Sequence, residues 1–201
     1  MNATGVVVAG GRSTRFGDRE KALAELDGRP MLAHVVATLS AVADSVVVNC
    51  RPDQRAAFAD ALAGYDTDIA WALDERPDEG PLAGLATALA AADTDRAVVL
   101  GCDMPLADAA TLGTLLDRLG DHDAVVPRTD GGPEPLHAVY RVEPTLSAAR
   151  ATLGDGERSL RALLDGLDVN YVEETVPARS LTSIDTEARL RAVQTDGGAP
   201  E

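Results

Sequence analysis

Short apolar runs alternate with helical patterns in the first half of the chain, and this alternation limits the folds that the sequence can adopt. Runs of four to eight aliphatic and β-branched residues between helical stretches are typical of strands buried on both faces of a parallel sheet. The runs cover residues 5–9, 45–49, 69–73 and 97–101, and the helical patterns cover residues 30–43, 53–63 and 81–92. Because crossovers between parallel strands are right-handed, helices should cover both faces of the sheet. We therefore expect an α/β fold whose ligands bind at the carboxyl ends of the strands.

The expected fold is Rossmann-like, with a mostly parallel sheet and one active site. Turn residues support the element boundaries: Asp53 and Asp108 suit N-caps, Gly64 suits a helix end, and Pro81 suits a first helical turn. After residue 120 the pattern loosens, but it still predicts elements that extend the same sheet. The later strands cover residues 124–127, 136–140 and 169–174, and the later helices cover residues 144–152, 159–164 and 186–193.

The length and composition favour one compact domain. The chain has 201 residues, of which 45% are hydrophobic, and this is enough for a sizeable core. We assign residues 1–194 to a single domain and residues 195–201, which contain glycine, proline and acids, to a flexible tail. Cys50 and Cys102 lie in separate apolar stretches without metal-ligand spacing, so both are expected to be buried thiols.

The chain is strongly acidic, which disfavours several classes of partner. It carries 33 acidic and 18 basic residues, a formal net charge of −15, and Lys21 is its one lysine. Such a surface repels nucleic acid and anionic membranes, and the depletion of lysine adds the indication of a salt-loving source. No apolar run approaches the ~20 residues that span a bilayer, and the sequence begins without a signal-peptide pattern. We expect a cytoplasmic protein that binds no nucleic acid and no membrane.

A glycine-rich loop follows the first predicted strand. It reads Ala-Gly-Gly-Arg-Ser-Thr-Arg-Phe-Gly over residues 9–17, and backbone N–H groups at this edge of a sheet can bind an anion. The adjacent Gly10 and Gly11 match neither Gly-x-Gly-x-x-Gly nor a Walker A loop. Taken alone, the loop could also be a turn with solvated arginines. Lys21 follows shortly, and because its compact ammonium suits a position between phosphate oxygens, the combination favours phosphate binding.

Polar residues also follow the later predicted strands. Asn49 and Asp74 end the second and third strands, and Asp103 follows the fourth. A carboxylate that emerges from a buried strand is costly without a partner, so we expect a cation to meet Asp103, although this residue could instead cap the next turn. Asn49 could likewise be no more than an amide that ends a strand. Gly80 allows a ligand to approach the backbone closely.

Several segments resemble motifs of the MobA-like nucleotidyltransferases, whose fold is of the nucleotide-diphospho-sugar transferase type. Residues 8–17 followed by Lys21 resemble the family signature Leu/Val-Ala-Gly-Gly-x-Ser-x-Arg-φ-Gly, with Phe16 where methionine is usual. Three later segments also resemble family motifs: residues 79–84 (Glu-Gly-Pro-Leu-Ala-Gly), residues 102–105 (Cys-Asp-Met-Pro) and, more weakly, residues 183–187 (Ser-Ile-Asp-Thr-Glu). The last segment departs from the family at Ser183, where asparagine is usual.

The resemblance implies a role for each matching position. Lys21, Arg15 and Asp103 are the expected catalytic residues, with Lys21 on the α-phosphate and Arg15 on the leaving pyrophosphate. Mg²⁺ is the expected cofactor, held by Asp103 and Asp185, although Asp185 is also placed to cap the last helix. Nucleotide contacts are expected from Val8, Ala9, Gly10, Gly11, Ser13, Lys21, Asn49, Asp74, Gly80 and Leu82.

The resemblance further implies a Mg²⁺-dependent guanylyltransferase that moves GMP from GTP to a phosphate-bearing acceptor, with molybdopterin the expected acceptor. Transient contacts with other proteins of cofactor biosynthesis are implied on the same ground. Arg158 and Arg161 fall near the family's acceptor-side elements, where they are either phosphate ligands or solvated helix residues. Transfer of CMP to molybdopterin, of GMP to cobinamide phosphate, or of a nucleotide to a sugar phosphate stays open, as does a non-catalytic nucleotide-binding adaptor.

The residues fit nucleotidyl transfer better than hydrolase or dehydrogenase chemistry. A phosphate monoester, with a second pKa near ~6, is already ionised at neutral pH and needs no base. His34, His122 and His137 show no Ser/His/Asp pattern. A dinucleotide-binding dehydrogenase needs an acid at the end of the second strand, where Asn49 and Cys50 stand. We therefore expect cations rather than acid–base groups to stabilise the transition state.

Overall fold

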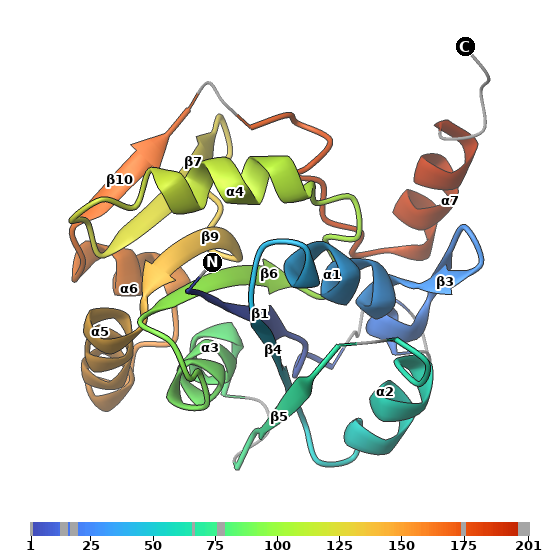
Figure 1. Cartoon of the computed structure of the whole chain (residues 1–201), viewed down its shortest axis with the longest axis horizontal. Coiled ribbons are helices and arrows are strands. Elements are labelled where there is room, and N and C mark those ends of the chain that lie inside the picture. The colour runs from blue at the N-terminus through green and yellow to red at the C-terminus, as the bar shows by residue number, and fades with distance from the viewer. Residues whose placement is uncertain are drawn as a thin grey trace.

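A twisted sheet runs through the molecule and carries helices on both faces (Figure 1). The computed structural model describes residues 2–12, 16, 20–65, 67–75, 79–173 and 176–196. Within these residues the sheet has eight strands, in the order β10-β7-β9-β6-β1-β4-β5, with β8 paired to β7. The expected α/β fold is thus confirmed, and every strand predicted from the apolar runs is present.

The first half of the chain forms the parallel part of the sheet. Its strands are β1 (Thr4–Val8), β4 (Ser45–Cys50), β5 (Ile69–Leu73) and β6 (Arg96–Gly101). The central strand β1 lies between β4 and β6, and Val8 is aligned with Asn49 on one side and with Gly101 on the other. Because all four strands run the same way, their carboxyl ends meet at one edge of the sheet.

The second half extends the sheet with mixed strand directions. Its strands are β7 (Ala124–Thr129), the short β8 (Gly132–Pro133), β9 (His137–Arg141) and β10 (Val169–Val172). Strand β9 is antiparallel to both β6 and β7, whereas β10 is parallel to β7. Because β9 runs antiparallel to β6, the residues just before β9, including Leu136, lie at the edge where β6 ends. There the Gly101 N–H donates to the Leu136 carbonyl at 2.9 Å.

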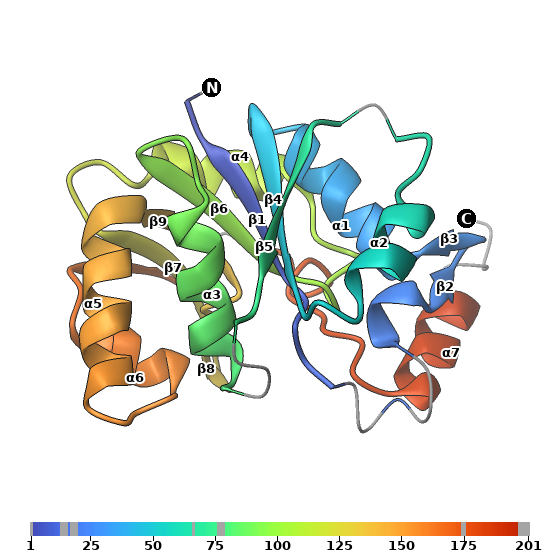
Figure 2. The same cartoon turned by 90° about the horizontal axis from the view of Figure 1, so that it is seen from below.

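The helices divide between the two faces according to the side-chain layers they cover. One layer involves α1 (Met31–Ser40), α2 (Arg55–Ala61) and α4 (Ala109–Asp117). The other involves α3 (Pro81–Ala90), α5 (Val142–Gly154) and α6 (Leu160–Asp165), which lie together on one side in Figure 2. Since side chains alternate along a strand, Val7 of β1 points into the first layer and Val6 and Val8 point into the second.

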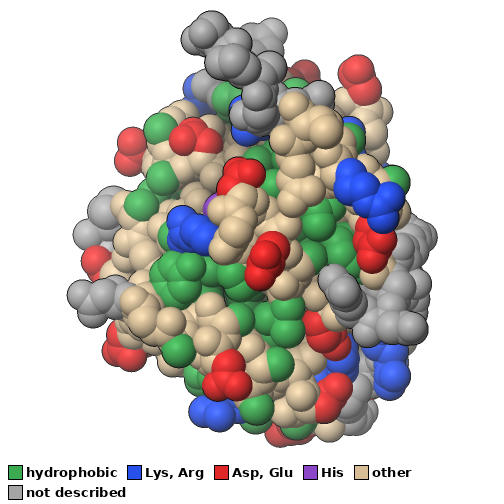
Figure 3. Space-filling view, turned by 90° about the vertical axis from the view of Figure 1, so that its right-hand side faces the viewer, with side chains coloured by type: hydrophobic (Ala, Val, Ile, Leu, Met, Phe, Trp, Pro, Cys, Tyr) green, Lys and Arg blue, Asp and Glu red, His purple; other side chains and the backbone are tan. Residues whose placement is uncertain are grey.

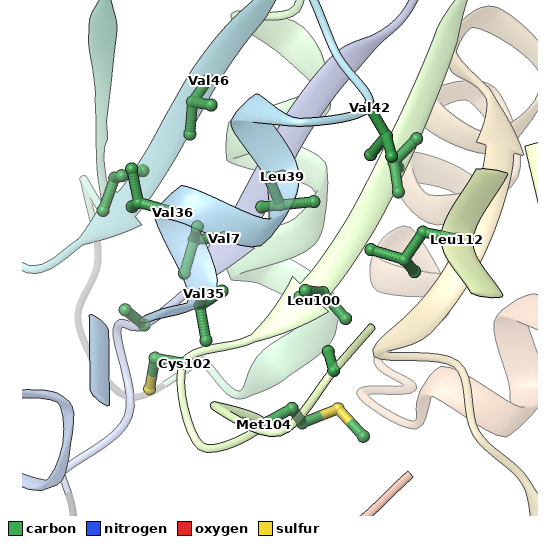
Figure 4. Packing of buried hydrophobic residues seen from close by; sticks show 14 of the residues in the cluster. Val7, Val35, Val36, Leu39, Val42, Val46, Leu100, Cys102, Met104 and Leu112 are labelled. Atoms are coloured by element: carbon green, nitrogen blue, oxygen red, sulfur yellow. The ribbon is translucent and has the colours of Figure 1, made fainter. Parts of the chain in front are cut away.

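Aliphatic residues make up most of the first layer. In Figure 4, Val35 and Leu39 of α1 lie over Val7, while Leu100 of β6 and Leu112 of α4 lie beside them. All of these side chains are fully buried. Burial of each such side chain stabilises the fold by roughly 1.5–3 kcal/mol, so this layer fixes the positions of β1 and β6 and hence of the loops at their ends.

A small appendage lies beside the parallel part of the sheet. It comprises a 3₁₀ helix η1 (Lys21–Leu23), a hairpin of β2 (Glu25–Leu26) and β3 (Arg29–Pro30), and α7 (Glu187–Asp196). Its core consists of Phe16, Leu26, Met31 and Ile184, with Leu190 and Val193 packed against them. Figure 2 shows α7 next to the β2–β3 hairpin. The chain's last helix therefore returns to the loop region that follows β1.

The hairpin turn is made by Asp27 and Gly28, which both have positive φ angles, 52° and 73°. A two-residue turn with two positive φ angles is of type I′, whose twist matches that of the flanking strands. The hairpin was missed in the sequence because each of its strands has only two residues. Residues 195 and 196, which were assigned to the tail, belong to α7, since this helix extends to Asp196. Residues 197–201 lie outside the described residues.

The predicted helix caps have different outcomes. The carboxylate of Asp108 accepts a hydrogen bond from the Thr111 N–H at 2.8 Å, so its predicted N-cap is confirmed. The prediction for Asp53 is wrong, because α2 begins after Gln54 without a side-chain cap. The Asp53 carboxylate instead accepts two hydrogen bonds from the guanidinium of Arg51, both at 3.1 Å.

On one face of the molecule, the acidic side chains are spread rather than gathered. Figure 3 shows the molecule from the right-hand side of Figure 1. Aspartate and glutamate side chains are scattered over this face, with hydrophobic side chains between them. This distribution agrees with the net charge of −15. None of the helices in the described part of the chain is both long enough and apolar enough to span a bilayer.

Candidate active site

A cavity of about 310 Å³ opens at the carboxyl ends of the parallel strands. Its walls come from the loop after β1, the ends of β4, β5 and β6, and the first turn of α3. The predicted site residues in its lining are Val8, Ala9, Gly10, Gly11, Lys21, Asn49, Asp74, Gly80 and Asp103. The fold therefore brings together residues that are up to 95 positions apart in the sequence, since the set runs from residue 8 to residue 103.

Two of the predicted residues lie outside the described part of the chain, and two others do not line the cavity. Ser13 and Arg15 lie outside the described residues, so their expected roles stay predictions. Leu82 is fully buried in the core layer under α3 and does not line the cavity. Asp185 is also outside the lining, although it lies close to residues that are in it.

Lys21 and Asp103 form an ion pair at the floor of the cavity. The Lys21 Nζ lies 2.7 Å from the Asp103 Oδ2, and the two side chains are 21% and 20% exposed. Asp103 reaches this position because β6 ends at Gly101, and Lys21 reaches it because it begins η1 after the glycine loop. Burial opposes the charge of Lys21, but the surrounding groups, Cys102, Asp103 and Asp185, outweigh it and raise the pKa of Lys21. The ammonium is therefore charged at neutral pH.

Asp185 approaches the same ion pair from the segment before α7. The Ile184 N–H donates to the Asp103 carbonyl at 2.7 Å, which fixes this segment against the end of β6. The half-buried Asp185 carboxylate contributes to the raised pKa of Lys21. The cap of α7 that was considered for Asp185 is made by Thr186, whose Oγ1 accepts a hydrogen bond from the Arg189 N–H at 3.1 Å.

Asn49 and Asp74 form a second polar pair in the cavity lining, next to Gly10 of the glycine loop. The Asn49 Nδ2 donates to the Asp74 Oδ1 at 2.6 Å and to the Ala72 carbonyl at 3.1 Å. Burial raises the pKa of Asp74, although the hydrogen bond from Asn49 and the charge of Arg51 oppose this shift. The Asn49 Oδ1 is buried and has no hydrogen-bond partner among the described residues. A buried acceptor without a partner is costly, so a bound donor would stabilise it.

Glycines allow the backbone to approach this pair. A Cβ atom on Gly10 would lie 2.2 Å from the Asp74 Oδ2, and one on Gly84 would lie 2.5 Å from the Asn49 Oδ1. Real Cβ atoms do not approach oxygen so closely, so both positions exclude larger residues unless the polar pair moves. For Gly84 this contact is more specific than the general helix–sheet packing considered from the sequence.

Three residues behind the glycine loop were missed in the sequence. Arg51, Glu20 and Gln54 form a hydrogen-bonded cluster that contacts the carbonyl groups of Gly10 and Gly11. The available signal was an arginine that directly follows a buried strand, where its long polar side chain needs partners. Sequence alone does not say whether those partners are solvent or the neighbouring loop.

The arginines expected near the acceptor have other contacts. The Arg158 guanidinium lies 3.7 Å from the Glu79 carboxylate at the rim of the cavity, and Arg158 is 48% exposed. The Arg161 guanidinium donates to the Gly131 carbonyl at 3.0 Å. The histidines are absent from the described cavity lining, and His137 is fully buried elsewhere.

The residues present fit a magnesium ion that binds together with its substrate. No group of three or more His, Cys, Asp or Glu side chains suited to a metal occurs in the parts of the chain described. Mg²⁺ commonly takes one or two carboxylates and completes its shell with water and substrate phosphates, so a cage of protein ligands is not required. Asp103 and Asp185 converge on one cation, the Lys21 ammonium, and therefore supply suitable carboxylates.

Comparison with known proteins gives consistent relatives. The sequence model of the family described as "MobA-like NTP transferase domain" matches residues 5–175. A protein of Natronomonas pharaonis named "Probable molybdenum cofactor guanylyltransferase" is 43% identical over 192 residues, which cover 93% of this chain and 94% of the relative. The "Molybdenum cofactor guanylyltransferase" of Pseudomonas entomophila is 35% identical over 190 residues, 92% of this chain and 90% of the relative.

Solved structures share the fold over nearly the whole chain. The crystal structure of "Molybdopterin-guanine dinucleotide biosynthesis protein A" from Archaeoglobus fulgidus superposes with a TM-score of 0.76 at 25% sequence identity. The match covers 97% of this chain and 98% of that one. The similarity therefore includes the mixed second half of the sheet and the returning α7, as well as the parallel half.

Proposed function

The chain belongs to the MobA-like NTP transferase family, and from this premise we propose that it is a molybdenum cofactor guanylyltransferase. In the proposed reaction, a phosphate oxygen of molybdopterin attacks the α-phosphorus of GTP, a new phosphorus–oxygen bond forms, and pyrophosphate leaves. The observation that carries the proposal is the Lys21–Asp103 pair, 2.7 Å apart, in the same cavity as the glycine loop and the Asn49–Asp74 pair.

The Asn49–Asp74 pair supports a preference for guanine. Guanine presents two adjacent donors, N1–H and the N2 amine, whereas adenine and cytosine present an acceptor at the equivalent ring nitrogen. The pair offers acceptors: the second oxygen of Asp74 and the unpartnered Asn49 Oδ1. A base with donors satisfies these groups, and a base with an acceptor in the same place leaves them unpaired in a buried setting.

The glycine loop and Lys21 suit the triphosphate. Negative charge accumulates on several phosphate oxygens as pyrophosphate leaves, and fixed cations and N–H groups stabilise it without reorganising during the reaction. We assign the α-phosphate to the Lys21 ammonium and the loop N–H groups of Gly10 and Gly11 to the remaining phosphates. The leaving pyrophosphate is assigned to Arg15, which lies outside the described residues.

Asp103 and Asp185 are the residues that would hold magnesium. When bound, Mg²⁺ neutralises phosphate charge and orients the reacting groups. The protein itself keeps the carboxylates of Asp103 and Asp185 near the Lys21 ammonium. The metal site and the cation that binds phosphate would thus be neighbours. The acceptor phosphate needs no base, and the described lining contains no histidine that would act as one.

The proposal includes a location and further partners. Both cysteines are free and buried, which suits a reducing compartment, and we therefore place the reaction in the cytoplasm. Proteins that supply molybdopterin or accept the finished cofactor are the proposed transient partners. The surface has a net charge of −15, so these contacts are expected to strengthen when the facing surface is basic.

A direct test incubates the protein with Mg²⁺ and each of the four ribonucleoside triphosphates in turn, and molybdopterin, cobinamide phosphate and a sugar phosphate are supplied as acceptors in separate reactions. Pyrophosphate release and formation of a molybdopterin dinucleotide are measured together. We expect both products with GTP and a rate at least tenfold lower with the other three. Faster turnover of CTP would reassign the base, turnover only with a sugar phosphate or cobinamide phosphate would reassign the acceptor, and GTP binding without any turnover would favour a non-catalytic adaptor.

A further inference from the structure

Arg51 lies behind the glycine loop, on the side away from the cavity. It directly follows β4, its side chain is 8% exposed, and it does not line the cavity. One nitrogen of its guanidinium, Nη1, donates to the Gly10 carbonyl at 3.2 Å and to the Gly11 carbonyl at 2.9 Å. A single side chain therefore holds two successive carbonyl groups of the loop.

The same guanidinium is fixed by two carboxylates. Its Nη2 donates to the Glu20 Oε1 at 2.7 Å, and its Nε and Nη2 donate to the two oxygens of Asp53, both at 3.1 Å. Burial alone would lower the pKa of Arg51, but hydrogen bonds to Asp53 and Glu20 outweigh burial and raise it. With two carboxylates around one guanidinium, the cluster has no net positive charge to offer a distant phosphate.

Gln54 completes the cluster and aligns its members. The Gln54 Oε1 accepts from the Arg51 N–H at 2.9 Å, and the Gln54 Nε2 donates to the Glu20 Oε2 at 2.8 Å. The same nitrogen lies 3.4 Å from the Gly11 carbonyl oxygen. The polar ends of Arg51, Glu20 and Gln54 are thus hydrogen-bonded to one another, to Asp53 or to the loop carbonyls, which makes the arrangement rigid.

Peptide geometry transmits this arrangement to the cavity. In a planar trans peptide, the carbonyl of one residue and the N–H of the next point in opposite directions. Fixing the Gly10 carbonyl toward Arg51 therefore turns the Gly11 N–H away from it, and fixing the Gly11 carbonyl turns the Arg12 N–H away. Gly11 and Arg12 both line the cavity. Without the clamp, two glycine peptides would be free to rotate their carbonyls toward the phosphates and repel them.

We propose that Arg51, with Glu20 and Gln54, is a positioning residue that orients the N–H groups of Gly11 and Arg12 toward the phosphates of the nucleotide. This inference rests on the proposed function for the identity of the ligand, and it assigns to Arg51 an action through the loop rather than a contact with substrate. Its fork-shaped guanidinium is required, because a lysine ammonium in the same place cannot hold two carbonyls and two carboxylates at once.

The test compares Arg51→Lys with the wild type in binding and in turnover. Equilibrium dissociation constants are measured for GTP with Mg²⁺ and for inorganic triphosphate, alongside kcat and KM for GTP. We expect affinity for both ligands to fall roughly tenfold, KM for GTP to rise by a similar factor, and kcat to change by less than about threefold. If Arg51 acted by its charge alone, Arg51→Lys would keep wild-type affinity, and this outcome would overturn the proposal.

Two control variants separate positioning from loss of stability. Arg55→Lys changes an arginine of α2 that lies over the Trp71 ring, 5.5 Å from its centroid, and is not hydrogen-bonded to the described residues of the loop. Phe58→Leu shortens a fully buried side chain of the same helix and lowers stability, while it leaves the hydrogen-bonding side chains of the cluster in place. Both should leave triphosphate affinity within about twofold of the wild type. An equal loss of affinity in Phe58→Leu, at a matched melting temperature, would mean that Arg51 is merely structural.

A readout without ligand or turnover completes the test. Amide hydrogen exchange of Gly11 and Arg12 should be at least tenfold faster in Arg51→Lys than in the wild type, and unchanged in Arg55→Lys. Loss of triphosphate affinity with faster exchange supports the clamp even if the wild type fails to transfer GMP, in which case the proposed function alone fails. Unchanged exchange, or a wild type that binds neither GTP nor triphosphate, contradicts the clamp itself.

Discussion

The two halves of the sheet treat polar groups differently. At the ends of β1, β4 and β6, buried or half-buried side chains are locked to one another in short contacts, such as Lys21 with Asp103 at 2.7 Å and Asn49 with Asp74 at 2.6 Å. Around β7, β9 and β10, ionisable pairs are more exposed, as for His122 with Asp168, whose side chains are 43% and 69% exposed. The side chains at the ends of the parallel strands are therefore held in defined positions by their partners.

This contrast has a physical basis. Charged groups removed from water are tolerated only when they are paired, and pairing fixes their geometry. Exposed charges interact weakly and adapt to what binds. Substitutions in the first half should therefore alter catalysis without unfolding the protein, whereas substitutions in the second half should alter stability or acceptor binding. The four predictions below test that division.

The largest effect is expected from the ion pair. Lys21→Met and Asp103→Asn should each lower kcat/KM for GTP by roughly 10³-fold, because each removes a fixed charge from the site where phosphate charge develops. Steady-state pyrophosphate release measures the loss, and thermal unfolding provides the control, with melting temperatures expected close to that of the wild type. Turnover within tenfold of the wild type in either variant would show that the pair is structural.

A somewhat smaller effect is expected at the base. Asp74→Asn places an amide donor where guanine also presents a donor, so kcat/KM for GTP should fall by about 10²-fold. Xanthine has a carbonyl in place of the N2 amine and should pair with the new amide, so the variant should prefer XTP over GTP. The ratio of the two kcat/KM values is the measurement. Equal losses for both nucleotides would place the base away from Asp74.

In the second half, His137 should control stability in acid. It is fully buried at the start of β9, neither ring nitrogen has a partner among the described residues, and burial lowers its pKa to about 4. Because the folded pKa lies below the unfolded value of 6.5, the unfolded chain binds more protons between these pH values. The contribution of His137 to the free energy of unfolding is therefore fully present above pH 6.5. It falls by about 3 kcal/mol as the pH falls toward 4.

Chemical denaturation at several pH values checks this prediction, with His137→Gln as the matched variant. The variant should lose less stability than the wild type between neutral and acid pH, while the general effect of protonating carboxylates remains in both. GTP turnover at neutral pH should be similar in the two proteins, which would separate this residue from the catalytic half. Parallel stability curves would show that another group is responsible.

The smallest effect is expected at the cavity rim. Arg158→Ala removes an exposed guanidinium whose described ion pair, with Glu79, is long. We expect less than about a twofold change in KM for GTP, since exposed pairs contribute little. Initial rates at varied molybdopterin complete the measurement: a rise in the acceptor's KM alone would identify Arg158 as an acceptor ligand, whereas a large rise in KM for GTP would contradict the division between the halves.

The strands of the parallel half, and the polar residues at their carboxyl ends, could be predicted from the sequence. Apolar runs bounded by turn residues predicted β1, β4, β5 and β6 to within about one residue, because strands buried on both faces leave a strong pattern. Asn49, Asp74 and Asp103 could be grouped in advance, since parallel strands end at the same edge. Their chemical roles remain predictions.

Other features could not be predicted, for reasons that differ. The antiparallel direction of β9 depends on how the chain returns between β6 and β7, and side-chain alternation is the same in either direction. The β2–β3 hairpin is too short to leave a pattern. The Asp53 cap failed because Arg51, only two residues away, competes for its carboxylate, and Arg51 itself is held by contacts with Gly10 and Gly11, some 40 positions earlier.

Transfer of GMP from GTP can be tested directly with two labelled substrates. GTP labelled at the α-phosphorus and GTP labelled at the γ-phosphorus are each incubated with the wild-type protein, Mg²⁺ and molybdopterin. We predict that the α label enters the molybdopterin product and the γ label leaves as pyrophosphate, and that neither change occurs with Lys21→Met. An α label that stays in free nucleotide while the γ label appears as orthophosphate would show hydrolysis instead and would contradict it.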